Sequence, residues 1–160
     1  MYRLSPAWAA SRGDGGPTAP MARSAGSPLP AELLARPVLV IEDEALLAWM
    51  LESLLGDLGF AEIVMAASES EAVRLLGDRS PGAIVSDINL GVGVPDGVEA
   101  AGTLAGTAAI PVVFVTAHAG PVNRARIAEA FPRHAIVAKP VALETLAAGL
   151  LAALDGPSVH

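Results

Sequence analysis

Short runs of apolar residues alternate with longer amphipathic segments from Pro37 almost to the end of the chain. The runs are apolar throughout rather than at every second position, which is typical of strands buried on both faces of a sheet. They cover residues 38–41, 63–65, 83–85, 112–115 and 135–137. Each precedes a predicted helix, over residues 45–58, 69–76, 96–104, 122–130 and 143–154. Five strand–helix units predict an α/β domain with a doubly wound, five-stranded parallel sheet.

The first predicted helix has the clearest periodicity. Its apolar residues recur at helical spacing on one stripe, whereas its acidic residues lie elsewhere. The stripe consists of Leu46, Leu47, Met50, Leu51, Leu54, Leu55 and Leu58. We expect these side chains to belong to the core and not to a cofactor site.

Length and composition restrict the class of protein. A chain of 160 residues with 52% hydrophobic residues has room for one domain of ordinary size with a full core. The sequence has no cysteine, which excludes a disulfide framework, a thiol nucleophile and thiolate metal sites. A reducing cytoplasm is therefore the expected location.

The first part of the chain differs from the rest. Residues 1–35 are rich in Gly, Pro, Ser and Ala and show no apolar period, so we predict a disordered tail there and a folded domain over residues 36–156. Alternatively, part of this tail reflects the choice of start site, because Met21 could equally begin the chain. After residue 36 the chain carries 15 acidic and 6 basic residues, which disfavours binding to nucleic-acid phosphates.

The longest stretch without a formal charge, residues 100–123, is long enough in principle to cross a bilayer. It contains Pro111 and Pro121 together with several Gly and Thr, and it divides into a helix end, a strand and a loop. The N-terminus also lacks the apolar segment of a secretory signal. We therefore expect neither a membrane span nor export.

Polar residues follow the first, third, fourth and fifth apolar runs, at the points where the predicted strands end. In an open parallel sheet, ligands bind beyond the carboxyl ends of the strands, where the strand order reverses. The residues at these ends are Glu42, Asp43 and Glu44, then Asp87, then Thr116 and His118, and finally Lys139 and Pro140. Carboxylates, a hydroxyl and an ammonium group are thus expected along one edge of the sheet.

Each of these residues has a simpler interpretation when taken alone. The acidic triplet that begins at Glu42 could simply cap the following helix. Thr116 could be a turn residue, and His118 could be a solvated loop residue. Lys139 is more informative, because it is the only lysine in the chain and the other nine basic residues are arginine. A lone lysine suggests a need for a compact point charge.

The combination predicts a cation site. If Asp43 and Asp87 approach within about 4 Å, they repel each other by roughly 4 kcal/mol at an effective dielectric near 20. A positive group must therefore occupy the site. Carboxylate and carbonyl oxygens suit a hard cation such as Mg²⁺, and Lys139 can serve the same pocket.

Four motifs in this order resemble the receiver domains of two-component signalling, over residues 37–154. The stretches that carry the resemblance are 38–44 (VLVIEDE), 84–90 (IVSDINL), 114–117 (FVTA) and 138–140 (AKP). The resemblance implies a flavodoxin-like (βα)5 fold with strand order 2-1-3-4-5. It also implies that Asp87 is the phospho-acceptor and that Glu42 and Asp43 form the acidic pair that holds Mg²⁺.

The same resemblance assigns the remaining site residues. The backbone carbonyl of Asn89 completes the metal site, Thr116 hydrogen-bonds the phosphoryl group, and Lys139 pairs with its oxygens. The Lys139–Pro140 peptide bond is expected to be cis, which an X-Pro bond can adopt at modest cost.

By this resemblance, the protein is a stand-alone response regulator rather than a metabolic enzyme, and it catalyses only its own phosphorylation and dephosphorylation. A sensor histidine kinase or a histidine phosphotransfer protein would supply the phosphoryl group. Because no output domain is recognised after residue 154, an unknown protein would read the face made by the fourth and fifth predicted helices and the fifth strand. A diffusible switch, a phosphate sink in a relay and a regulator of a histidine kinase all fit.

Two other classes of function stay open. A receiver-like adaptor would bind its partner without being phosphorylated, although it would not need a complete site. A phosphatase with an aspartyl nucleophile would ordinarily carry that residue after the first strand, where this chain has Glu42-Asp43-Glu44.

The chain departs from the commonest receiver pattern at three positions. Ile136 stands where an aromatic residue is usual, three residues before the active-site lysine. Gly91 replaces the customary Pro four residues after the phospho-acceptor, in a longer loop. His118 stands two residues after Thr116, near the site entrance with the Asn89 side chain, where the two could set the rate of dephosphorylation.

Overall fold

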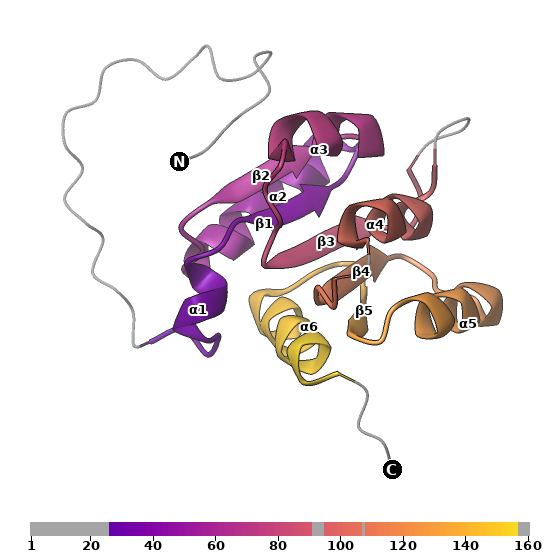
Figure 1. The fold of residues 1–160 in the computed structure, drawn as a ribbon. Coiled ribbons are helices and arrows are strands. Elements are labelled where there is room, and N and C mark those ends of the chain that lie inside the picture. Colours follow the sequence, from indigo (N-terminus) through magenta and orange to yellow (C-terminus); the bar gives the residue numbers. More distant parts are fainter. Residues whose placement is uncertain (1–25, 91–94, 107, 157–160) are drawn as a thin grey trace.

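Five parallel strands form the centre of the structure, with helices on both faces (Figure 1). A computed structural model describes residues 26–90, 95–106 and 108–156. The strands are β1 (Val38–Ile41), β2 (Ile63–Ala66), β3 (Ala83–Asp87), β4 (Val112–Thr116) and β5 (His134–Ala138). Their order is β2-β1-β3-β4-β5, and every pairing is parallel. This arrangement confirms the predicted flavodoxin-like, doubly wound fold.

The predicted helices are present with nearly the expected bounds. They are α2 (Ala45–Asp57), α3 (Glu69–Leu76), α4 (Gly97–Ala105), α5 (Pro121–Ala130) and α6 (Leu143–Asp155), and a short helix, α1 (Ala31–Leu34), precedes the sheet. Asp96 begins α4 with a capping box, in which its carboxylate accepts from the backbone of Val98 and Glu99 while the Glu99 side chain accepts from the backbone of Asp96. This cap fixes where α4 begins.

The core lies in two layers, one on each face of the sheet. Successive side chains of a strand point to opposite faces, so Val38 and Val40 join the layer beneath α2 and α6, whereas Leu39 and Ile41 join the layer beneath α3, α4 and α5. All four residues of β1 are fully buried. Burial on both faces explains why the strands are apolar throughout.

The predicted boundary of the N-terminal tail needs a correction. Ala31–Leu34 forms α1, and Leu29 and Leu33 are each only 5% exposed in the core layer that α2 and α6 cover. The folded part therefore begins before residue 36, because these two leucines bury apolar surface against the domain. Residues 1–25, the rest of the predicted tail, lie outside the described residues.

The predicted core stripe of α2 is wrong at its first residue. Leu51, Leu55 and Leu58 are buried, but Leu46 is 67% exposed, as is its neighbour Trp49 at 59%. At about 100° per residue, Leu46 lies about 140° around the helix axis from Leu51 and about 180° from Leu55, so it faces away from the sheet when these two leucines face it. Among the described helices, none is both long and apolar enough to cross a membrane.

Candidate functional site

Buried polar residues gather at the carboxyl ends of β1, β3 and β4. Glu42 follows β1 and is 3% exposed, Asp87 ends β3 at 5%, and Thr116 ends β4 at 2%. Ser86, next to Asp87, is fully buried as well. Polar groups are seldom buried without partners or a function, so this edge of the sheet is the candidate site.

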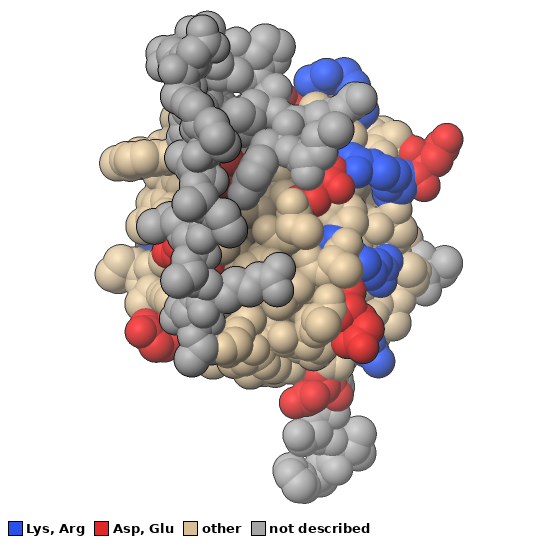
Figure 2. Space-filling view, turned by 90° about the vertical axis from the view of Figure 1, so that its left-hand side faces the viewer, with Lys and Arg blue, Asp and Glu red and all other residues tan. Residues whose placement is uncertain are grey.

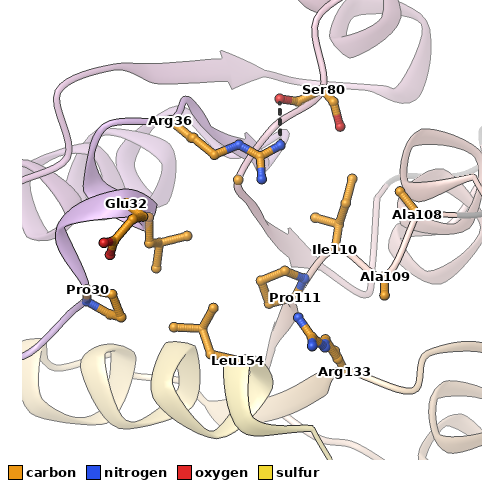
Figure 3. Close-up of a pocket in the computed structure, with 12 residues that line it drawn as sticks. Pro30, Glu32, Arg36, Ser80, Ala108, Ala109, Ile110, Pro111, Arg133 and Leu154 are labelled. Carbon is orange, nitrogen blue, oxygen red and sulfur yellow. Dashed lines mark hydrogen bonds between the residues drawn. The ribbon is translucent and has the colours of Figure 1, made fainter.

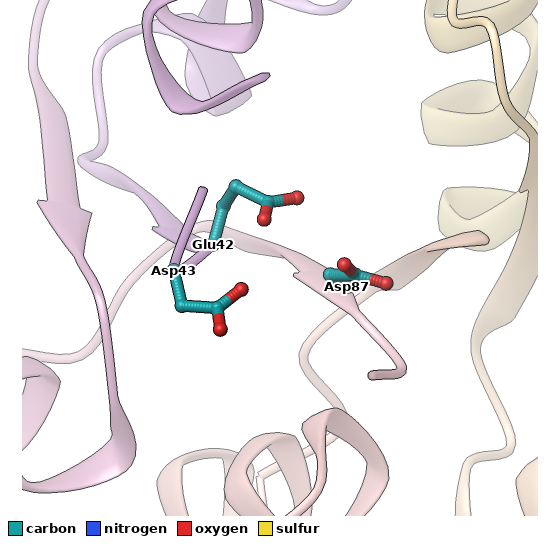
Figure 4. Close-up of side chains that lie close together, drawn as sticks. All are labelled: Glu42, Asp43 and Asp87. Carbon is teal, nitrogen blue, oxygen red and sulfur yellow. The ribbon is translucent and has the colours of Figure 1, made fainter. Parts of the chain in front are cut away.

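Three carboxylates face one another there. Glu42 and Asp43 leave β1 side by side, with their carboxylates directed toward Asp87 on β3 (Figure 4). One oxygen from each of Glu42, Asp43 and Asp87 lies within 4.8 Å of the others. β1 and β3 are neighbours in the sheet, with Ile41 opposite Ser86, so the strand pairing itself brings the carboxylates together.

Lys139 supplies the positive charge at this site. It follows β5, and its Nζ donates to Asp87 Oδ2 at 2.9 Å and to Glu42 Oε2 at 3.5 Å. Burial alone would lower the pKa of Lys139, but the hydrogen bond to Asp87 and the negative charges of Glu42 and Asp87 outweigh it and raise that pKa. Lys139 therefore stays protonated beside the carboxylates.

The ionised form of Glu42 is subject to opposing effects. Its Oε1 accepts from the backbone N–H of Glu44 at 3.0 Å, which favours the ionised form. Burial disfavours the ionised form more strongly than this bond favours it, and the nearby negative charge of Asp87 disfavours it further. The pKa of Glu42 is therefore raised from 4.5. Three carboxyl groups thus lie near a single ammonium group, that of Lys139.

The other predicted site residues lie around Asp87. The backbone N–H of Asn89 donates to Asp87 Oδ1 at 3.1 Å. The Thr116 hydroxyl does not bond to Asp87; it donates to the carbonyl of His118 at 3.1 Å and accepts from the His118 N–H at 3.2 Å. The Lys139–Pro140 bond is cis, as predicted. Gly91 lies outside the described residues.

The donor set fits a magnesium ion. Hard divalent cations prefer oxygen ligands and bind through one or two carboxylates while keeping several waters. Glu42, Asp43 and Asp87 offer carboxylate oxygens within one ion's reach, and Asp43 is exposed, so water has access. The chain has no thiol that would favour a softer metal.

Sequence reasoning missed the contacts behind Asp87. The Ser86 hydroxyl lies 3.2 Å from the carbonyl oxygens of both Asp87 and Gly97, which share its single proton as acceptors. Asp96 also pairs with Arg126 of α5, Nη1 to Oδ2, at 2.9 Å. The capping pattern of Asp96 and Glu99 is visible in the sequence, whereas the pairing of residues 30 positions apart is not.

A second hollow, of about 380 Å³, lies at the opposite end of the sheet, between α1 and the end of α6. Arg36 points into it and donates to the carbonyl of Ser80 (Figure 3). It also donates to the carbonyl of Pro81. Arg133 and Glu32 also line it, but it contains no cluster of carboxylates and no buried ionisable group. It therefore lacks the chemistry found at the edge that holds Asp87.

The described surface in Figure 2 shows basic side chains in separate spots with acidic side chains beside them. Two ion pairs of this kind are Arg79 with Glu62 at 2.6 Å and Arg74 with Glu71 at 3.5 Å. These pairs place a carboxylate beside each of the two guanidinium groups.

Comparison with known proteins gives one family for most of the chain. The family described as response regulator receiver domain matches residues 38–150. The chain is 40% identical over 95 residues to the phyllosphere-induced regulator PhyR of Methylorubrum extorquens, which covers 59% of this chain and 35% of PhyR. The chain thus spans about a third of the length of that relative.

Solved structures agree with this family. The signal receiver domain of a modulated diguanylate cyclase from Desulfovibrio desulfuricans G20 has a TM-score of 0.65 and 32% identity, covering 76% of this chain and 94% of that one. The anti-anti-sigma factor PhyR from Bartonella quintana has a TM-score of 0.59 and 30% identity, covering 76% of this chain and 48% of that one.

Proposed function

Since the chain belongs to the family of response regulator receiver domains, we propose that Asp87 accepts a phosphoryl group from a sensor histidine kinase or a histidine phosphotransfer protein. The observation that carries this proposal is the 2.9 Å contact between Lys139 Nζ and Asp87 Oδ2, inside a cluster of three carboxylates. A buried carboxylate held beside a fixed cation is suited to attack an anionic phosphoryl group.

In the proposed step, one carboxylate oxygen of Asp87 attacks the phosphorus of a phosphohistidine. A P–O bond forms, the P–N bond breaks, and its electron pair stays on the imidazole nitrogen of the donor, which takes up a proton. Lys139 is already placed to bind an oxygen of the arriving group, since its Nζ bonds Asp87. Positioning and electrostatics do most of the work in such transfers.

Mg²⁺, held by Glu42, Asp43, Asp87 and the backbone carbonyl of Asn89, would neutralise the negative charge of the phosphoryl oxygens. The fixed groups of the chain do the rest. Thr116 and Asp87 lie at the carboxyl ends of adjacent strands, so the Thr116 hydroxyl would rotate from the His118 carbonyl toward an oxygen of the phosphoryl group on Asp87. Such local contacts are what a receiver domain converts into a signal.

The surface beside the site suits a protein donor. Leu46 and Trp49 are exposed on α2, and Trp49 lines a groove of about 520 Å³ together with Glu42 and Asp43. A donor that brings its phosphohistidine to Asp87 must cover this surface. Exposed apolar residues at the entrance of an acidic pocket therefore favour a protein over a small-molecule donor.

The outgoing signal would leave through the face formed by α5, β5 and α6, in the cytoplasm. β5 is an edge strand, three of its five residues are only half-buried, and Val122 on α5 is 72% exposed. The Bartonella relative is described as an anti-anti-sigma factor, which makes an anti-sigma factor one candidate for the protein that reads this face.

Intact mass after incubation with Mg²⁺ and acetyl phosphate tests the proposal, with Asp87→Asn as the control. We expect a Mg²⁺-dependent gain of one phosphoryl group that Asp87→Asn abolishes, and a change in the fluorescence of Trp49 on adding beryllofluoride. The lifetime of the product separates a phosphate sink, which loses the group quickly, from a switch. No gain in mass and no response to beryllofluoride would sink the proposal and favour the phosphorylation-independent adaptor.

A further inference from the structure

Asp96 and Gly97, here called the α4 corner, lie directly behind the phospho-acceptor. Gly97 has no room for a side chain: a Cβ atom there would lie 1.6 Å from the carbonyl oxygen of Asp87 and 2.7 Å from Ser86 Oγ. The N–H of Gly97 donates to the carbonyl of Ile88 at 3.0 Å. The backbone of Asp87 and Ile88 therefore cannot shift toward α4 without moving the α4 corner.

The α4 corner is in turn fixed to α5. Arg126 donates to both carboxylate oxygens of Asp96, at 2.9 Å through Nη1 and 3.4 Å through Nη2. The Asn123 side chain of the same helix accepts from Arg126 at 3.3 Å. Two-point binding of a carboxylate by a planar guanidinium fixes orientation as well as distance.

These contacts form one continuous path from Asp87 through Gly97 and Asp96 to Arg126. We propose that this path links the phosphorylation site to α5, with Arg126 as a positioning residue that holds the α4 corner against the backbone of Asp87. The inference rests on the proposed function, since it needs a group to arrive at Asp87. It assigns a role to Arg126, which touches neither the carboxylate cluster nor Lys139.

A group bound to Asp87 would disturb the contacts at the start of this path. Asn89 and Ile88 follow Asp87 directly; the N–H of Asn89 bonds Asp87 Oδ1, and the carbonyl of Ile88 holds Gly97. A group attached to the Asp87 carboxylate competes for that oxygen and so displaces the segment that carries the Ile88 carbonyl. The displacement reaches α5 only if the Asp96–Arg126 pair is intact.

Coupling between two sites is reciprocal, which supplies two independent readouts. If filling Asp87 changes the strength of the Asp96–Arg126 contact, then breaking that contact must change the affinity at Asp87 by the same factor. A merely structural role for Arg126 would lower thermal stability without changing either readout.

The test uses amide NMR of the full chain, titrated with beryllofluoride in Mg²⁺, for wild type, Arg126→Gln, Asp96→Asn and the double variant. Asparagine keeps an oxygen that can accept from Val98 and Glu99, so the α4 cap survives. Arg79→Gln is the matched control, because it breaks a surface ion pair with Glu62 that is remote from the α4 corner.

We expect beryllofluoride to shift the α5 amides of wild type and of Arg79→Gln equally. In Arg126→Gln these shifts fall to less than half, the shifts of Asn89 and Thr116 persist, and the affinity for beryllofluoride changes about fivefold. The double variant resembles either single variant, because both changes break one link. Arg126→Lys, which keeps the charge but not the two-point contact, gives an intermediate result.

Full α5 shifts and unchanged beryllofluoride affinity in Arg126→Gln and in the double variant would overturn the inference while leaving the proposed function intact. No response of wild type at Asn89, Thr116 or α5 would instead overturn the proposed function, and the inference with it. If the Arg126→Gln spectrum lacks native dispersion, Asp96→Asn takes its place. Reduced α5 shifts with altered beryllofluoride affinity in that variant support the inference, and full shifts with unchanged affinity overturn it.

Discussion

Gly97 packs on the main-chain carbonyl of Asp87 so closely that a Cβ atom would lie 1.6 Å from the oxygen. Backbone cannot yield as a flexible side chain does. Gly97→Ala should therefore destabilise the fold by about 1–3 kcal/mol, the usual cost of forcing atoms into a packed interior. Urea denaturation followed by circular dichroism measures this loss.

Gly102 provides the matched control on the same helix. A Cβ there would meet only the Phe131 ring, at 3.8 Å, which is an ordinary contact. Because alanine is the better helix former, Gly102→Ala should stabilise by up to about 1 kcal/mol. Equal effects of the two substitutions would contradict the close packing described for Gly97.

Removing the ammonium of Lys139 should expose the charge imbalance of the site. Lys139→Met keeps most of the apolar stem but leaves Asp87 and Glu42 without their cation, so we expect a loss of about 1–3 kcal/mol without metal. Added Mg²⁺ should reduce this deficit, since it supplies positive charge to the same carboxylates. Urea denaturation in EDTA and in Mg²⁺ makes the comparison, and an identical deficit in both would show that the stem alone matters.

Glu42 gives a pH dependence of definite sign. Burial raises the pKa of Glu42 above 4.5, so its contribution to stability is present below about that pH and is lost as the pH rises through the higher folded-state value. Glu42→Gln should consequently stabilise the metal-free protein at pH 7 and have little effect near pH 4. Thermal unfolding in EDTA at both pH values checks this, and a less stable variant at pH 7 would refute it.

Asp96 behaves in the opposite way. Burial opposes the change, but the hydrogen bond from Arg126 outweighs it and lowers the pKa of Asp96 below 3.8. Its stabilisation is therefore present above about pH 3.8 and is lost as the pH falls through the lower folded-state value. Arg126→Gln should cost about 0.5 kcal/mol at pH 7, the usual value for a partly exposed ion pair, and almost nothing at pH 2. A cost that stays constant from pH 7 to pH 2 would mean that the pair contributes no charge interaction.

Most of the fold could be predicted because its signals are local. Strands such as β1 are apolar throughout and therefore buried on both faces, and parallel strands bring their carboxyl ends to one edge. Glu42, Asp87 and Lys139 could be assigned to one pocket on that basis, although they are up to 97 residues apart. Strand order and the cis Lys139–Pro140 bond followed only from the resemblance to receiver domains.

The features that could not be predicted depend on tertiary packing. α1 is four residues long, too short for any apolar period, and it is held by the burial of Leu29 and Leu33. Helical spacing placed Leu46 at the edge of a broad apolar stripe on α2, but spacing does not tell which part of that stripe faces the sheet. The Asp96–Arg126 pair likewise requires the positions of α4 and α5, which no short motif encodes.

Lys139 is the only lysine in the chain, so the ε-amine inside the pocket is a unique chemical handle. Apart from the α-amino group, an acylating reagent has a single amine to modify, and it reacts only with the deprotonated form. The Asp87 and Glu42 carboxylates keep that amine protonated and partly shielded. The extent of acylation, read as intact mass, therefore reports the occupancy of the site without any engineered label.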